Sequence, residues 1–168
     1  MTLCAHIGFE EVSERELFLV DAPLPEDVPS VFSLQSKHFV CLLAWDSQSV
    51  PTSTILALAS RICATGCAYI CCWGPGCERV HDIFDEADLK LRPNGPWVMS
   101  TWHNDEPLSE AIWFSLFNSY PDDAYFEQCR AVVGISIGAP EWAAEIRSAF
   151  SAPGNFSASV LASEADDA

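Results

Sequence analysis

Fourteen residues from Tyr69 to Asp82, YICCWGPGCERVHD, place cysteines and acid–base side chains around a Gly-Pro-Gly turn. Carboxylate and imidazole groups are the side chains that most often transfer protons in catalysis. Glu78 and His81 are three residues apart, which puts them on neighbouring positions of a helix, where they could share a ligand or a metal. A first-turn glutamate also complements the helix dipole, and both interpretations stay open.

A second polar stretch, TWHNDE, carries His103 with two carboxylates, Asp105 and Glu106. Asn or Asp can cap a following helix, and Glu favours its first turn. Capping does not explain His103, nor the tryptophans Trp73 and Trp102 that close the two preceding apolar runs. An aromatic side chain there suits stacking on a flat ligand, although core packing is the commoner role of Trp.

Apolar runs and helical periods alternate from residue 38 onward, which predicts strands that are each followed by a helix. The predicted strands are 38–45, 67–73, 96–102 and 129–138. The predicted helices run from about 52 to 66, 76 to 91, 107 to 119 and 140 to 150. Strands that are apolar on both faces are typical of a parallel sheet covered by helices on both sides. The fold class predicted is a three-layer α/β/α sandwich, Rossmann-like, with a mainly parallel sheet of four or five strands, whose order stays open.

The two ends of the chain lack this pattern. We expect residues 1–37 to be an irregular segment in which ERELFLVDAP adds a possible edge strand. Residues 38–150 form the α/β domain. The small, polar residues 151–168 end in acidic side chains, and we expect this tail to be disordered.

Ligands of open parallel sheets bind outside the carboxyl ends of the strands, so the loops after the four strands are the expected place for a site. The candidate catalytic residues are Glu78, His81 and His103. The candidate ligand-binding residues are Asp46, Trp73, Gly74, Gly76, Trp102, Asp105 and Glu106.

Charge and composition narrow the partners. With 24 acidic against 8 basic residues in 168, the net charge is −16, which repels a phosphate backbone and excludes nucleic acid, whereas a basic protein surface remains a plausible partner. No apolar run is long enough to span a membrane, and no secretory signal begins the chain, so we expect no membrane partner and a cytoplasmic location.

The eight cysteines lack a C-x-x-C pair, and we expect them to be reduced rather than to bind a metal. Cys77, near a helix start, remains an alternative nucleophile. Dinucleotide, P-loop and α/β-hydrolase motifs are absent, and no cofactor is expected.

A strand, a Trp-bearing loop and a glutamate in the next helix, over about Cys71 to Glu78, resemble the arrangement in Toll/interleukin-receptor-type NAD hydrolases and nucleoside deoxyribosyltransferases. In those families the glutamate works at the ribose C1 of an N-glycosidic bond, so the resemblance implies that role for Glu78. The pairing of WGPGCERVHD with TWHNDEPLSEAIWF is similar to a set of uncharacterised bacterial proteins, over most of 38–150, and implies no activity.

Two functions follow as hypotheses. The first is a small-molecule or catalytic pocket at the carboxyl edge of the sheet, hydrolytic or N-glycosidic on a nucleotide-like molecule, with Arg79 available to neutralise a phosphate. The second is a non-enzymatic, acidic protein-binding module such as an immunity or antitoxin-like protein, whose contact patch would be the apolar helix around Leu108 to Phe117.

Overall fold

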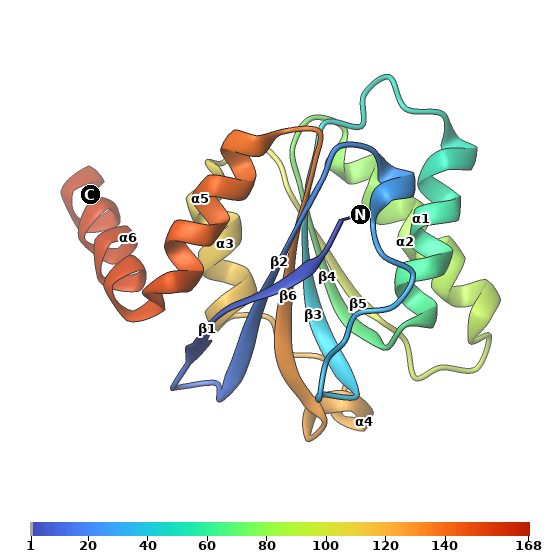
Figure 1. The fold of residues 1–168 in the computed structure, drawn as a ribbon, viewed down its shortest axis with the longest axis horizontal. Helices are drawn as coiled ribbons and strands as arrows, with labels where there is room; N and C mark the ends of the chain where they lie inside the picture. Colours follow the sequence, from blue (N-terminus) through green and yellow to red (C-terminus); the bar gives the residue numbers. More distant parts are fainter. Residues whose placement is uncertain (1) are drawn as a thin grey trace.

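Six strands form one sheet in the order β1-β2-β6-β3-β4-β5 in the computed structural model, which describes residues 2–168 (Figure 1). The strands are β1 (Cys4–Glu10), β2 (Arg15–Ala22), β3 (His38–Trp45), β4 (Cys67–Trp73), β5 (Met99–His103) and β6 (Cys129–Ile137). β1 runs antiparallel to β2, and the other neighbouring pairs are parallel. The predicted α/β class with a mainly parallel sheet is confirmed.

Helices cover both faces of the sheet, because its central strands are apolar on both sides. In β3, Cys41 and Leu43 belong to one buried cluster, and the alternate residues Val40 and Leu42 belong to the other. Helices α1 (Thr52–Ala64) and α2 (Cys77–Leu91) pack on the first face. Helices α3 (Leu108–Phe117) and α5 (Pro140–Ser151) pack on the second face, as Figure 1 shows. A 3-10 turn, η1 (Pro25–Asp27), and a short helix, α4 (Asp123–Phe126), lie in the connections.

The N-terminal segment is more regular than we expected. The stretch ERELFLVDAP does form a strand, β2, but this strand lies inside the sheet between β1 and β6 rather than at its edge. The additional edge strand is β1, whose partly exposed residues give it no clear apolar alternation. Gly8 lets β1 lie against helix α5, since a Cβ at this position would stand 2.3 Å from the carbonyl oxygen of Phe150. The sheet therefore has six strands rather than four or five.

The C-terminal tail is also ordered, contrary to the expected disorder. Residues 153–167 form helix α6 (Pro153–Asp167), which contacts α3 and β1. Val160 is the buried residue of this helix, Phe156 packs against the second cluster, and the indole nitrogen of Trp113 donates a hydrogen bond of 3.1 Å to Ser157 Oγ. A few apolar contacts with another helix, rather than the polar composition of the segment, decide its structure.

Helix α6 changes the interpretation of α3. The apolar helix was the expected contact patch of a binding module, but Leu108, Ile112 and Leu116 are buried, and α6 packs beside the half-buried Trp113. No helix within residues 2–168 is long and apolar enough to cross a membrane.

Docking of α6 can be tested by introducing a charge at its buried position. We predict that Val160→Asp releases α6 from α3, because a carboxylate would lose its water there, and lowers the free energy of unfolding by about 2 kcal/mol. Hydrogen–deuterium exchange over residues 153–167 should accelerate. Ala162→Asp, at an exposed position of the same helix, is the matched control and should leave exchange unchanged. Equal exchange in wild type and Val160→Asp would show that Val160 does not hold the helix.

Candidate functional site

The loops that follow β4 and β5 meet at the carboxyl edge of the sheet and enclose a hollow of about 230 Å³. The two strands pair in a register that sets Trp73 opposite His103, so both loops leave the sheet side by side. The hollow is lined by Trp73, Gly74, Pro75, His103, Asn104, Asp105 and Glu106. Five of the ten predicted site residues are thus brought together, and the lining contains no lysine or arginine.

His103 lies at the base of this hollow in a row of hydrogen bonds. Its Nδ1 pairs with the Glu106 carboxylate, and its Nε2 is 3.0 Å from Thr101 Oγ1. Because a carboxylate only accepts, this pairing assigns the proton to Nδ1, and Nε2 then accepts from the Thr101 hydroxyl. The ring packs against Phe114 at 4.8 Å between ring centres and is 8% exposed. The row Thr101–His103–Glu106 therefore fixes the position and tautomer of the imidazole.

The protonation of this row is set by burial and by the neighbouring acids. Burial lowers the pKa of His103, although the Glu106 carboxylate at Nδ1 favours the charged ring. A hydrogen bond with Glu106 raises the pKa of Glu110, one helical turn further on, and partial burial acts in the same direction. His103 is consequently neutral near pH 7.

Trp73 holds the loop that carries the acids. Its indole nitrogen donates a hydrogen bond of 2.8 Å to the backbone oxygen of Glu106, and its ring meets Trp142 edge to face, with centres 5.0 Å apart. Gly74 has a φ of 110°, and a Cβ there would stand 2.4 Å from the carbonyl oxygen of Trp45. Only glycine allows the loops after β3 and β4 to approach this closely. Trp73 thus contributes both to the wall of the hollow and to its rigidity.

His81 and Trp102 lie on the other face of the sheet. Successive residues of a strand point to opposite faces, so Trp102 faces α2 while His103 faces α3. The His81 and Trp102 ring centres are 4.6 Å apart, and the His81 nitrogens lie 2.9 Å from an oxygen of Asp82 and 3.6 Å from an oxygen of Asp85. The structure therefore separates this pair from the hollow, and His81 pairs with these aspartates instead of Glu78.

The remaining predicted residues lie outside the hollow. Glu78 is exposed in the first turn of α2, and Gly76, with a φ of 81°, begins that helix against Ser47. Asp46 is exposed and accepts a hydrogen bond of 3.2 Å from the amide of Gln48, which shapes the loop after β3. Gly76 and Asp46 therefore shape the loops beside the hollow.

Two alternatives considered for this edge lose their support. Arg79 donates to the backbone oxygens of Ser47 and Val50, so its guanidinium holds the loop after β3 rather than facing a ligand. Cys77 is 1% exposed, and burial raises the pKa of its thiol, which disfavours the nucleophilic thiolate. Among residues 2–168, no group of three or more His, Cys, Asp or Glu side chains is placed to hold a metal ion.

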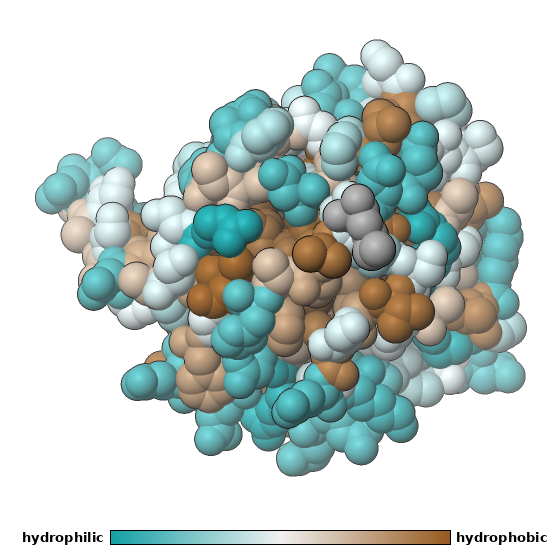
Figure 2. All heavy atoms as spheres, viewed as in Figure 1, coloured by the Kyte–Doolittle hydropathy of each residue, from teal (hydrophilic) through white to brown (hydrophobic). Residues whose placement is uncertain are grey.

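Sequence reasoning missed Thr101 and Glu110. Thr101 lies two residues before His103 on the same strand, and Glu110 lies in the first turn of α3, four residues after Glu106 in the preceding loop, so period-2 and i,i+4 spacing were the signals available. It also missed a larger hollow of about 760 Å³, lined in part by His6, Phe9, Glu16 and Phe18. Figure 2 shows apolar residues near the centre of the face that carries β1, bordered by hydrophilic ones.

Comparison with known proteins identifies a family. The sequence model of the family described as "Domain of unknown function (DUF7684)" matches residues 17–153, which is more than half of the chain. The protein belongs to this family. The match includes β2 through α5 and therefore contains the hollow and the Thr101–His103–Glu106 row. No curated protein matches the chain.

The lowered pKa of His103 predicts a pH dependence of stability. Between pH 7.5 and about 6.5 the ring is neutral in both the folded and the unfolded chain. Below about 6.5 the ring of the unfolded chain gains a proton, whereas burial keeps the folded ring neutral. The contribution of His103 to stability therefore falls as the pH decreases. The free energy of unfolding of wild type and of His103→Gln can be compared by urea unfolding at pH 7.5 and 5.0. Wild type should lose more stability than the variant between pH 7.5 and 5.0. The NMR signals of the His103 ring should titrate below 6.5. A midpoint above 6.5 would show that the charge of Glu106 outweighs burial.

Proposed function

We propose that the hollow between the β4 and β5 loops is the active site of a small-molecule hydrolase in which Glu106 and Asp105 supply the reacting carboxyl groups. The observation that carries this proposal is that Glu106 lines the hollow while its carboxylate is held by the buried His103. A carboxylate positioned by a fixed partner, at the edge where ligands of parallel sheets bind, is suited to proton transfer.

The N-glycosidic reaction is the version that this arrangement supports best. Water attacks the ribose C1 as the bond from C1 to the base nitrogen breaks, and positive charge develops on the sugar. Asp105 takes a proton from the water, and Glu106 in its acid form donates a proton to the departing nitrogen, which gives a free sugar hydroxyl and a free base. A pair of carboxyl groups, one acting as base and the other as acid, is the usual arrangement for cleaving a glycosidic bond.

The lining favours a substrate without phosphate. The lining residues include no lysine or arginine, and the protein carries a net charge of −16, so a nucleoside fits better than a nucleotide. At about 30 Å³ per water molecule, 230 Å³ corresponds to about eight waters, which is room for the sugar or the base rather than both. Trp73 offers an aromatic wall to that group.

This proposal moves the reacting carboxylate from Glu78 to the next loop. The resemblance to Toll/interleukin-receptor-type NAD hydrolases and nucleoside deoxyribosyltransferases implied that Glu78 is the reacting group. Glu78 is exposed and does not line the hollow, whereas Asp105 and Glu106 do. Asp105 adopts a left-handed backbone conformation, with a φ of 57°, which turns the chain between β5 and α3.

The proposal predicts base release that depends on Glu106. Incubation with a panel of purine and pyrimidine nucleosides, followed by chromatography of free bases, should show cleavage of at least one nucleoside. Glu106→Gln and Asp105→Asn should each lower the rate by about 10²- to 10⁴-fold, the usual contribution of an acid–base group. His103→Gln should shift the pH profile of the rate, because His103 positions Glu106 rather than touching the substrate.

Two variants make the test selective. Asp82→Asn changes an exposed acid beside His81 and should leave the rate unchanged. Glu78→Gln should do the same, and a loss of rate in that variant, with Glu106→Gln unaffected, would return the role to Glu78. Absence of base release from every nucleoside, together with no change in melting temperature on adding them, would refute the proposal.

Surface charge supports the alternative of an acidic protein-binding module. The chain carries 24 acidic against 8 basic residues, a net charge of −16. Such a field steers a basic partner. Binding of that partner would be weakened by salt and unaffected by Glu106→Gln.

A further inference from the structure

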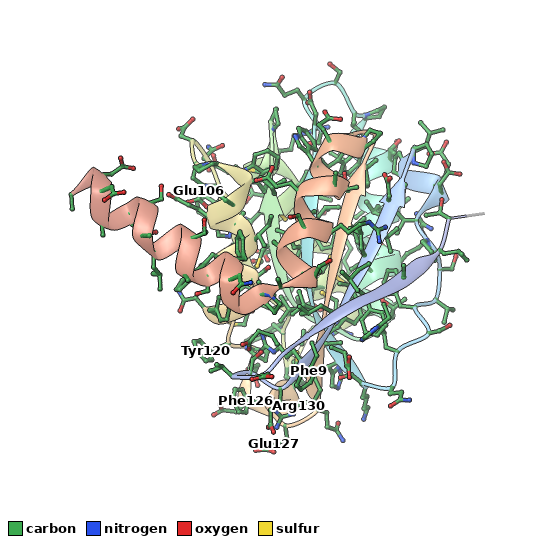
Figure 3. The ribbon with its side chains drawn as sticks, turned by 60° about the vertical axis from the view of Figure 1, so that its left-hand side comes forward. Phe9, Glu106, Tyr120, Phe126, Glu127 and Arg130 are labelled. Atoms are coloured by element: carbon green, nitrogen blue, oxygen red, sulfur yellow. The ribbon has the colours of Figure 1, made fainter. Side chains whose placement is uncertain are left out.

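A third hollow, of about 180 Å³, lies at the opposite edge of the sheet from the hollow between the β4 and β5 loops and contains a buried positive charge. Its lining includes Arg15, Arg130, Glu10, Leu116, Phe117 and Phe126. Figure 3 shows Tyr120, Phe126 and Arg130 close together at one end of the molecule, with Glu106 towards the other end. This site is therefore independent of the proposed active site.

Arg15 is the unusual component of this hollow. The side chain is 6% exposed and donates from Nη1 to Ser119 Oγ and from Nη2 to the Ser119 carbonyl oxygen, both at 3.0 Å. A guanidinium has five N–H groups, so these bonds leave donors over. Within residues 2–168 no carboxylate oxygen lies within 4.0 Å of Arg15, as the ion pairs there involve other residues. A charge buried in this way is costly unless an anion approaches it.

The other charged groups balance this charge only in part, since Arg15 helps to lower the pKa of Glu10 but makes no ion pair with it within 4.0 Å. Glu10 is buried in the same lining, but its carboxylate accepts hydrogen bonds from the amides of Val12 and Ser13 and from the Ser13 hydroxyl. Arg130 brings a second positive charge next to Arg15, and its only carboxylate contact among the described residues is with the exposed Glu14, at 3.8 Å. Two arginines and one engaged glutamate give the hollow a net charge of +1 in a protein of −16.

We propose that this hollow binds a small monocarboxylate that carries an apolar group. One negative charge brings the lining to neutrality, whereas a phosphate dianion would exceed it and meet Glu10. A planar carboxylate matches the planar guanidinium, and Leu116, Phe117 and Phe126 provide an apolar wall for the rest of the molecule. At about 30 Å³ per water, 180 Å³ corresponds to about six waters, the size of a short branched acid such as isobutyrate.

The test compares isobutyrate, its neutral isostere isobutyramide and inorganic phosphate, titrated into the full chain and followed by ligand-observed NMR. Isobutyrate should bind at least 10-fold more tightly than either of the others, because a hydrogen bond to a charged group is worth about 1.5–3 kcal/mol, or about 10- to 100-fold. Equal binding of the amide would overturn the role of charge, and equal binding of phosphate would overturn the carboxylate class.

Variants assign the binding to this hollow. Arg130→Gln should weaken isobutyrate about 10-fold, and Arg147→Gln, at an exposed position on α5, is the matched control and should leave it unchanged. Arg15→Lys keeps a charge in the core but loses the planar donors, and it should weaken isobutyrate without abolishing folding. Should Arg15→Lys unfold the chain, Arg130→Gln decides alone. Isobutyrate binding that is unchanged in Arg130→Gln would refute the site.

Discussion

The parallel pairing of β4 with β5 is the constraint on which the candidate active site depends. This register sets Trp73 beside His103, so that the two following loops share one wall and the indole can donate to the backbone of Glu106. Glu106 in turn meets the ring of His103 across three residues of the same loop. A shift of one residue would turn His103 to the α2 face and leave Glu106 without its partner, because strand side chains alternate.

Several of the few basic side chains of this acidic protein hold segments of the fold together. Arg61 donates to the carbonyl oxygens of Val28 and Pro25, and Arg79 donates to those of Ser47 and Val50, so each joins a loop to a helix. Arg92 pairs with the buried Asp88. A guanidinium suits these contacts because its fork of donors reaches two acceptors at once. Arg15 differs from them, since its two acceptors belong to one serine and, among residues 2–168, no carboxylate oxygen lies within 4.0 Å of its guanidinium.

Packing against distant segments determines the secondary structure of the two ends of the chain, where the sequence patterns are weak. The tail from residue 153 has a composition typical of disorder, but Phe156 packs against the second cluster and the helix contacts α3 and β1, so the segment is helical. β1 has no clear alternation because its faces are only partly covered, and the position of Gly8 against α5 becomes visible only in three dimensions. The contact of β1 with α5 joins residues more than a hundred positions apart, and the hydrogen bond between α3 and α6 joins residues about forty positions apart. Local periodicity does not record contacts at such separations.

The sequence by itself determined the α/β class, the four strands from β3 to β6 and the loops that hold polar groups, because apolar runs and helical periods are local signals. It also placed Trp73, His103, Asp105 and Glu106 at one edge, since parallel strands share their carboxyl ends. Only the tertiary structure decided which of the ten candidates face each other. Trp102 and His81 turned to the other face and Glu78 to solvent, because strand register and helix rotation are set by long-range packing. The charge of Arg15 likewise became notable only once the fold had buried it.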